Sequence, residues 1–157
     1  MILDYYKLQN EVMKSAWANE TKNKAMNWHY GKDDEHLYLT DGYAFYIIPK
    51  PFKYLDEETV FKNSAPFGGY RKILDAASDT CEAVMTNRSI ILPDGKKTAI
   101  AFQIENAEHE ETYIDKDLLK FFDVSECKFR TKNKKSLIYI CVGETLLGAV
   151  LPVKINV

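Results

Sequence analysis

The chain opens with apolar residues at helical spacing. In residues 4 to 17, DYYKLQNEVMKSAW, the positions Tyr5, Leu8 and Val12 recur every three or four residues, and Met13 or Ala16 completes the stripe. The polar residues of the segment fall on the other side: Lys7, Asn10, Glu11 and Lys14. Asp4 is a residue type favoured just before a helix. The pattern predicts an amphipathic helix that ends in the polar stretch WANETKNKA.

A strand pattern follows between residues 26 and 49. The runs MNWHY and HLYLTDGYAFYIIP flank GKDDE, whose glycine and short acidic side chains favour a turn. Leu37 and Leu39 share one face of the second run. Almost every residue after Gly42 is apolar, which predicts a strand buried on both faces. Asp41 and Gly42 form either a type I′ hairpin turn or a bulge inside one bent strand.

The Asp41 carboxylate is expected to accept backbone N–H groups in that turn. A ligand contact there is the less favoured interpretation, because the neighbouring residues are too apolar to surround a charged ligand without a partner. Asp41 and Gly42 are therefore interpreted as structural turn residues.

The remaining chain alternates irregular and periodic segments. Residues 50 to 70 contain prolines and a Gly-Gly pair, with one helical turn expected at 57 to 61. RKILDAASDTCEAV starts as a short helix and becomes a strand, and two apolar runs then flank the turn PDGK. EETYIDKDLLKFFDV returns to helical spacing, with Thr112 or Asp115 as its cap. The last third, CKFRT, SLIYICVG and LLGAVLPVKI, is a meander of strands.

Composition and charge fit one globular domain. The chain has 157 residues, of which 46% are apolar and 28% charged, enough for a core of its own. We expect a single domain over 1–157, with one half at about 1–65 and the other at about 78–157, joined by the irregular Pro/Gly-containing segment. The formal net charge of -2 argues against attraction of the whole surface to nucleic acid, and is too small for an acidic DNA mimic.

Two stretches resemble the bacterial sliding clamp, the processivity clamp of DNA polymerase. LYLTDGYAFYIIP is similar to a clamp strand that contains Thr-Asp-Gly-His, with Tyr43 where His is usual. The segment from YIDKDLLKFFD to LLGAVLPVKI is similar to the last half-domain of a clamp. It ends in Leu151-Pro152-Val153-Lys154 where clamps end in Met-Pro-apolar-basic, and Ser136-Leu137 replaces the usual Ser/Lys-Pro. The resemblance covers about 60 to 80 residues in the right order.

The resemblance implies an α+β, sliding-clamp-like domain. Antiparallel sheets would carry two helices on one side, in halves related by a pseudo-twofold axis. It also implies a non-catalytic protein of DNA replication or other DNA transactions, encoded by a phage or mobile element. A clamp ring resembles a circle of six such domains, so a ring requires a homo-oligomer of about six copies. Edge strands at the two ends are candidate contacts between copies.

Clamp helices also line the hole through which duplex DNA passes. Their lysines meet phosphates without reading bases. The matching residues here would be Lys7 and Lys14 on the first helix, and Lys116 and Lys120 on the second. These four lysines are the candidate DNA contacts.

A protein-binding module is the main alternative. Such a chain would inhibit or recruit a host replication or defence protein without binding DNA. The ten tyrosines and the near-neutral charge fit this function, because tyrosine is over-represented at interfaces.

An enzyme acting on nucleotides or nucleic acid is the third and weakest hypothesis. No Gly-x-Ser-x-Gly occurs, and APFGGYRK lacks the spacing of a phosphate loop. His29 and His36 flank an acidic turn but lack metal-ligand spacing, and IENAEHEETYI is interpreted as a solvated acidic loop. We expect no enzyme, no cofactor and no bound metal.

The cysteines and the N-terminus indicate the compartment. Cys81, Cys127 and Cys141 lie far apart with no C-x-x-C, as is typical of free thiols in a reducing environment. No run approaches the ~20 apolar residues of a membrane span. MILDYYKLQNEV lacks the regions of a signal peptide. We therefore expect a cytoplasmic protein that makes no membrane contact.

Overall fold

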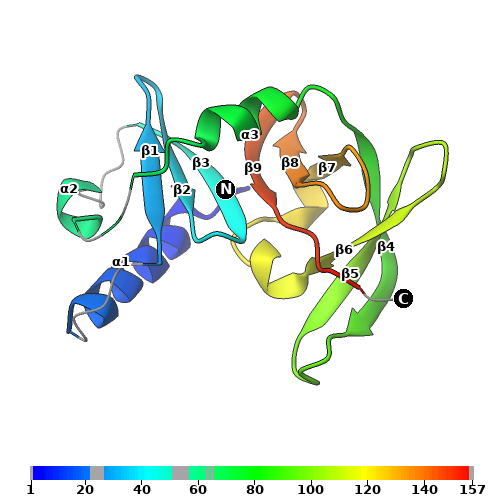
Figure 1. Cartoon of the computed structure of the whole chain (residues 1–157), viewed down its shortest axis with the longest axis horizontal. Helices are drawn as coiled ribbons and strands as arrows, with labels where there is room; N and C mark the ends of the chain where they lie inside the picture. Colours follow the sequence, from blue (N-terminus) through cyan, green and yellow to red (C-terminus); the bar gives the residue numbers. More distant parts are fainter. Residues whose placement is uncertain (1, 22–26, 51–56, 63, 65, 156–157) are drawn as a thin grey trace.

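The computed structural model describes residues 2–21, 27–50, 57–62, 64 and 66–155 (Figure 1). Nine strands in these residues form one antiparallel sheet, in the order β1-β2-β3-β9-β8-β7-β4-β5-β6. The strands are β1 His29–Lys32, β2 His36–Thr40, β3 Ala44–Pro49, β4 Cys81–Ile91, β5 Thr98–Ile104, β6 Glu111–Asp115, β7 Lys128–Thr131, β8 Ile138–Val142 and β9 Thr145–Val150. The helices are α1 Tyr5–Thr21, α2 Glu57–Val60 and α3 Tyr70–Ala76, with 3-10 turns η1 Lys116–Leu119 and η2 Val124–Glu126. The α+β class predicted from the sequence is confirmed.

Helix α1 packs on the sheet through the predicted stripe. The Lys7 backbone N–H donates to Asp4 Oδ1 at 3.1 Å, which satisfies one free N–H of the first turn. Leu8 and Val12 are fully buried, whereas Met13 is 42% exposed. Ala16 therefore completes the buried stripe, and Met13 belongs to the outer side of the helix.

The alternation of side chains along the strands separates two apolar clusters. In β2, Leu37 and Leu39 join the cluster that holds the buried side of α1, while Tyr38 joins the opposite cluster. Residues 44 to 48 of β3 are all buried, as the apolar run predicts. The second cluster is covered by α3, through Tyr70 and neighbouring residues. In Figure 1, α1 and α3 accordingly lie on opposite sides of β1–β3.

The helix predicted after Thr112 or Asp115 is only one turn. Residues 111–115 form β6, which pairs with β5, and only the four residues of η1 are helical. Asp115 does cap this turn, because its side chain accepts the Asp117 N–H. The chain then becomes extended, and Phe122 forms a β-bridge with Leu3. Two helices were expected on one side of the sheet. The structure has one helix, α1, and a single 3-10 turn, η1, in their place, and α3 covers the other face.

Three hairpin turns are built by the same side-chain device. Asp33, Asp41 and Asp94 each accept, through Oδ1, the backbone N–H groups two and three residues further on, at 2.8 to 3.0 Å. This is the local hydrogen bonding by which Asp favours turns. At the second turn Gly42 has φ +91°, a conformation that glycine adopts without strain. Asp41 and Gly42 therefore lie in the hairpin turn between β2 and β3, not in a bulge inside one strand. The turn is not of type I′, because only Gly42 of the two has a positive φ.

Both edge strands of the sheet are partly closed by other segments of the chain. The Phe67 N–H donates to the Tyr30 carbonyl at the β1 edge, at 3.0 Å. At the β6 edge, the Val153 N–H donates to the Tyr113 carbonyl at 2.8 Å. A second copy would therefore meet edges that already carry backbone hydrogen bonds. Among the helices in the described ranges, none has the length and apolar content to cross a membrane.

Candidate functional site

Four lysines predicted as DNA contacts lie around α1 and η1. Lys7 and Lys14 are exposed on α1, and Lys116 and Lys120 are exposed in and just after η1. The Lys120 ammonium lies 2.7 Å from Glu11 Oε1, which places η1 beside α1. Among the described residues, no ion pair involves Lys7, Lys14 or Lys116. The surface therefore holds three unpaired cations and one neutralised pair.

The position of η1 against α1 is set by backbone hydrogen bonds as well. The Asp4 N–H donates to the Phe121 carbonyl and the Asp123 N–H to the Ile2 carbonyl, both at 2.7 Å. The rings of Phe121 and Phe122 pack on Tyr46 in the core, with centroids 5.6 and 5.7 Å from it. Main chain and core therefore hold the two segments together, with Lys120 directly beside α1.

The outer side of α1 also carries large apolar side chains, which sequence reasoning missed. Trp17 is 75% exposed, Tyr6 50% and Met13 42%. At about 100° per residue, positions 6, 13 and 17 fall within a sector of about 40°, beside the sector of Lys7 and Lys14. The signal in the sequence was a second apolar repeat at i, i+7 and i+11. We call Tyr6, Lys7, Met13, Lys14 and Trp17 the outer α1 face.

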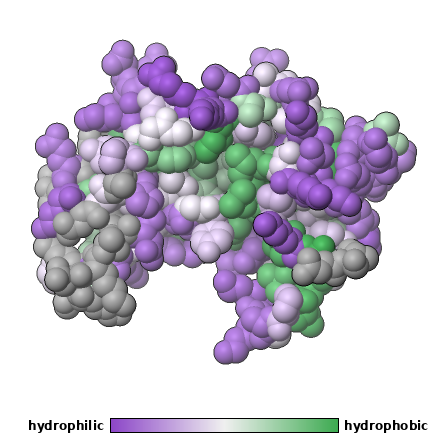
Figure 2. All heavy atoms as spheres, in the orientation of Figure 1, coloured by the Kyte–Doolittle hydropathy of each residue, from purple (hydrophilic) through white to green (hydrophobic). Residues whose placement is uncertain are grey.

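A pocket of about 680 Å³ lies at the other end of the molecule, along β6. The Val153–Tyr113 hydrogen bond holds the C-terminal segment against β6, and Thr112 Oγ1 donates to the Lys134 carbonyl at 3.3 Å. Part of the apolar surface in Figure 2 lies beside this C-terminal segment. Three segments line the pocket: Glu110 to Tyr113, Lys134 and Lys135, and Leu151 to Ile155.

One of the two acids in the wall of this pocket, Glu111, is already neutralised. Arg88 forms an ion pair with Glu111, and the Tyr113 hydroxyl donates to Glu111 Oε2 at 3.1 Å. The hydrogen bond from Arg88, more than that from Tyr113, lowers the pKa of Glu111, so this carboxyl group is ionised and paired. Lys134 and Lys135 are exposed at the rim. The pocket thus combines apolar lining with excess positive charge.

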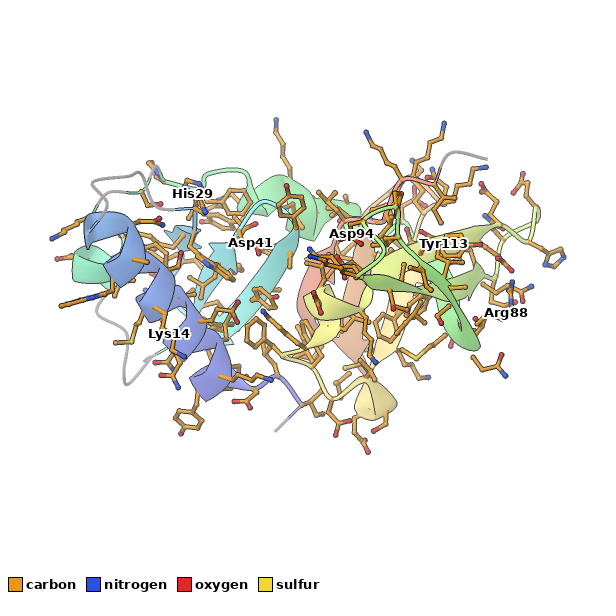
Figure 3. The ribbon with its side chains drawn as sticks, turned by 90° about the horizontal axis from the view of Figure 1, so that it is seen from below. Lys14, His29, Asp41, Arg88, Asp94 and Tyr113 are labelled. Atoms are coloured by element: carbon orange, nitrogen blue, oxygen red, sulfur yellow. The ribbon has the colours of Figure 1, made fainter. Side chains whose placement is uncertain are left out.

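The two surfaces are well separated. Figure 3 shows Lys14 at one end of the molecule and Arg88 and Tyr113 at the other. A ligand bound at the outer α1 face would therefore leave the β6 pocket accessible.

The histidine and acidic candidates do not converge. His29 Nδ1 lies 2.9 Å from Ser64 Oγ, whereas His36 Nδ1 lies 3.9 Å from Asp33 Oδ1. His29 pairs with Thr40 at one end of the β1–β2 hairpin, and His36 lies at the other end. Within the residues that the structure describes, no group of three or more His, Cys, Asp or Glu is arranged to hold a metal ion. In the acidic loop, Glu110 is bonded to Asn106 through both its N–H and its carboxylate.

Comparisons with protein-family models, with curated proteins and with solved structures give no match. The outer α1 face with η1, and the β6 pocket, are the two candidate sites that geometry supports.

Proposed function

We propose that the chain is a non-catalytic, clamp-like protein associated with DNA transactions, with α1 and η1 turned toward the DNA. The observation that carries this proposal is the order of six neighbouring strands, which start at the β1 edge of the sheet. In the six strands β1-β2-β3-β9-β8-β7, each half is a meander of three strands in chain order. One meander runs inward from β1 to β3, and the other runs inward from β7 to β9. A helical segment precedes each three-strand meander, α1 before β1–β3 and η1 before β7–β9.

This arrangement supports the repeated half-domain that the clamp resemblance implies. Strands β3 and β9 are antiparallel, with Phe45 opposite Ala149 near the middle of their contact. A twofold axis normal to the sheet at that contact would exchange β3 with β9, β2 with β8 and β1 with β7. The β4–β5 hairpin and β6 fall outside these six strands. In chain order, β6 comes directly before η1, just as the segment with Leu3 comes directly before α1.

The lysines around α1 and η1 would supply the DNA contacts. Lysine contacts to phosphates add affinity without reading sequence, so the binding is expected to be non-specific. With three unpaired lysines, the logarithm of the affinity should fall with the logarithm of salt concentration at a slope of about -3. Such binding is weak for one chain, and a ring of about six copies would hold DNA by enclosure instead. Sedimentation of the full chain separates a ring from a monomer or dimer.

Charge reversal on this surface tests the proposal. Changing Lys7, Lys14, Lys116 and Lys120 together to Glu should lower the affinity for duplex DNA at ~50 mM salt more than about tenfold, because four phosphate-facing positions become repulsive. The measurement is fluorescence anisotropy of a labelled duplex. The matched control changes to Glu three lysines of the β6 pocket and one from the same β7–β8 turn: Lys134, Lys135, Lys154 and Lys132. Equal loss in both variants, or no duplex binding by the unaltered chain, would contradict the proposal.

A protein-binding module is a second candidate, and the β6 pocket favours it. An apolar lining beside Lys134 and Lys135 suits an extended segment with alternating acidic and apolar side chains, presented by a host or phage protein. The chain would then act as an inhibitor or adaptor of that protein.

A model peptide tests this second function. A labelled peptide alternating Glu and Leu should bind the unaltered chain, and changing Lys134 and Lys135 to Glu should weaken this binding about tenfold, since two attractive charges become repulsive. Anisotropy at several salt concentrations measures the affinity. Changing Lys7 and Lys14 to Glu is the control and should leave peptide binding unaltered. If both pairs of substitutions weaken binding equally, the pocket is not the peptide site.

A further inference from the structure

We propose that the outer α1 face binds single-stranded nucleic acid, with bases stacked on Trp17 and Tyr6 and phosphates held by Lys7 and Lys14. This inference rests on the proposed function and names the form of nucleic acid that this surface fits. The clamp resemblance implies only phosphate contacts to duplex DNA from this side of the fold. Exposed aromatic rings beside the lysines add a second kind of contact.

The spacing of these side chains suits an extended strand. Tyr6 and Trp17 are eleven residues apart, which is about 16 Å along a helix. A strand with the ~3.4 Å per nucleotide of one duplex strand would cover this distance with about five nucleotides. Lys7 and Lys14 lie between the two rings along the helix axis, about 10 Å apart. Bases at the ends and phosphates between them would therefore meet side chains of the matching chemistry.

The charge of the face favours a polyanion. Glu11 is the only carboxylate among the side chains that the structure describes on α1, and Lys120 neutralises it at 2.7 Å. The Asp4 carboxylate, just before the helix, accepts the Lys7 N–H. Among the described residues, neither acid forms an ion pair with Lys7 or Lys14. Among the side chains that the structure describes on this face, an apolar stripe is bordered by cations, as on single-strand binding surfaces.

A single strand uses this surface better than a duplex does. In a duplex the bases are stacked inside, so Trp17 and Tyr6 would meet only sugar and phosphate. An unpaired strand presents base faces, and each base stacked on an aromatic side chain strengthens binding regardless of its identity. Most of the Trp17 side chain, 75%, is exposed to solvent. A protein partner with an acidic and apolar surface is the competing occupant, and the experiment distinguishes it.

The two tryptophans make the test direct. Trp28 is 6% exposed and packs against Tyr46 in the core, so a change of tryptophan emission on adding a ligand reports Trp17. The probes are a ten-nucleotide oligo-dT, a duplex of equal length and an abasic strand of equal length. We expect oligo-dT to quench the emission and to bind about tenfold more tightly than the abasic strand, which has phosphates but no bases. The full chain is used throughout.

Substitution of Trp17 completes the test. Trp17→Ala should weaken oligo-dT binding about tenfold, measured by anisotropy of the labelled strand, while binding of the abasic strand stays within a factor of two. Trp17→Phe should restore part of the loss, because a phenyl ring still stacks. The control is Ile91→Ala, which removes a side chain of similar exposure, 73%, from the end of β4, outside the outer α1 face.

Three results would overturn the inference. Equal affinity for duplex, abasic strand and oligo-dT, unaltered by Trp17→Ala, would leave only phosphate contacts and the clamp proposal would stand. Absence of binding to all three probes would overturn both. Loss of binding to the Glu-Leu peptide, but not to oligo-dT, on Trp17→Ala would make the outer α1 face a protein surface instead.

Discussion

Replacing Gly148 with alanine is expected to lower the free energy of unfolding by about 3 kcal/mol. Gly148 lies in β9 opposite Tyr46 of β3. An added Cβ would lie well under 3.0 Å from the Phe45 carbonyl oxygen and 3.3 Å from the Phe45 carbonyl carbon. These are backbone atoms of a buried strand, so relief of the overlap requires β3 and β9 to separate. Phe122 lies 3.4 Å from the same point and closes the third side.

The matched control is Gly68→Ala. Gly68 is exposed, and an added Cβ there would meet nothing within 4 Å. Its stability should stay within about 0.5 kcal/mol of the unaltered chain. Urea unfolding, followed by circular dichroism and by the emission of buried Trp28, measures both variants. If Gly148→Ala were as stable as Gly68→Ala, the β3–β9 contact at the centre of the proposed repeat would be wrong.

The local turns were the most predictable part of the fold. At Asp41 and at Asp94, an aspartate that bonds the N–H groups two and three residues on is followed directly by a glycine with positive φ. At Asp33 the acidic side chain alone builds the turn. All of this information lies within four residues, so the pattern of residue types is sufficient.

Long-range pairing was not predictable in the same way. The contacts of β3 with β9 and of β4 with β7 join residues far apart in the sequence, and no local pattern specifies them. The expected helix after residue 111 failed for a related reason. Ile114, Leu118 and Phe122 are spaced as on a helix, but β5 supplies a strand partner for residues 111–115. The chain after η1 also has a strand partner, because Phe122 forms a β-bridge with Leu3.

The candidate surface was predicted only in its charged part. The lysines were identified because clamp helices carry lysines, and in the structure Lys120 lies beside Glu11 of α1. The aromatic side of the outer α1 face was missed because α1 has two apolar repeats. The sequence alone does not say that the repeat of Leu8 and Val12 packs inward while that of Tyr6 and Trp17 stays exposed.

The turn at Asp33 is the second position where a single change should have a large effect. The Asp33 carboxylate accepts the N–H groups of Glu35 and His36 and, at 2.5 Å, the hydroxyl of Tyr38. Tyr38 is buried and stacks on Tyr70, with ring centroids 4.4 Å apart. Asp33→Ala should therefore lower the free energy of unfolding at neutral pH by about 2 kcal/mol, because three donors lose a charged acceptor. The neighbouring Asp34→Ala, at an exposed position, should change it by less than about 0.5 kcal/mol.

The same network makes stability depend on pH with a defined sign. The hydrogen bond from Tyr38, helped by the Glu35 and His36 N–H groups, lowers the pKa of Asp33 from 3.8 to about 2. A carboxyl group with a depressed pKa in the folded state stabilises the fold above its unfolded pKa, and this contribution is lost as pH falls from about 4 to about 2. Because the side chain is 36% exposed, we expect about 1 kcal/mol rather than the full value of the shift.

Urea unfolding of the unaltered chain and of Asp33→Asn, at pH values from 6 down to 2, measures this contribution. The difference in free energy of unfolding between the two chains should shrink by about 1 kcal/mol as the pH falls. Protonation makes Asp33 neutral at low pH, whereas Asn is neutral at every pH. In a Tyr38→Phe background the shrinkage should be smaller, since the largest cause of the depressed pKa is gone. A difference that stays constant from pH 6 to pH 2 would mean that Asp33 titrates in the folded chain as it does in the unfolded one, and the Tyr38 hydroxyl would then have another acceptor.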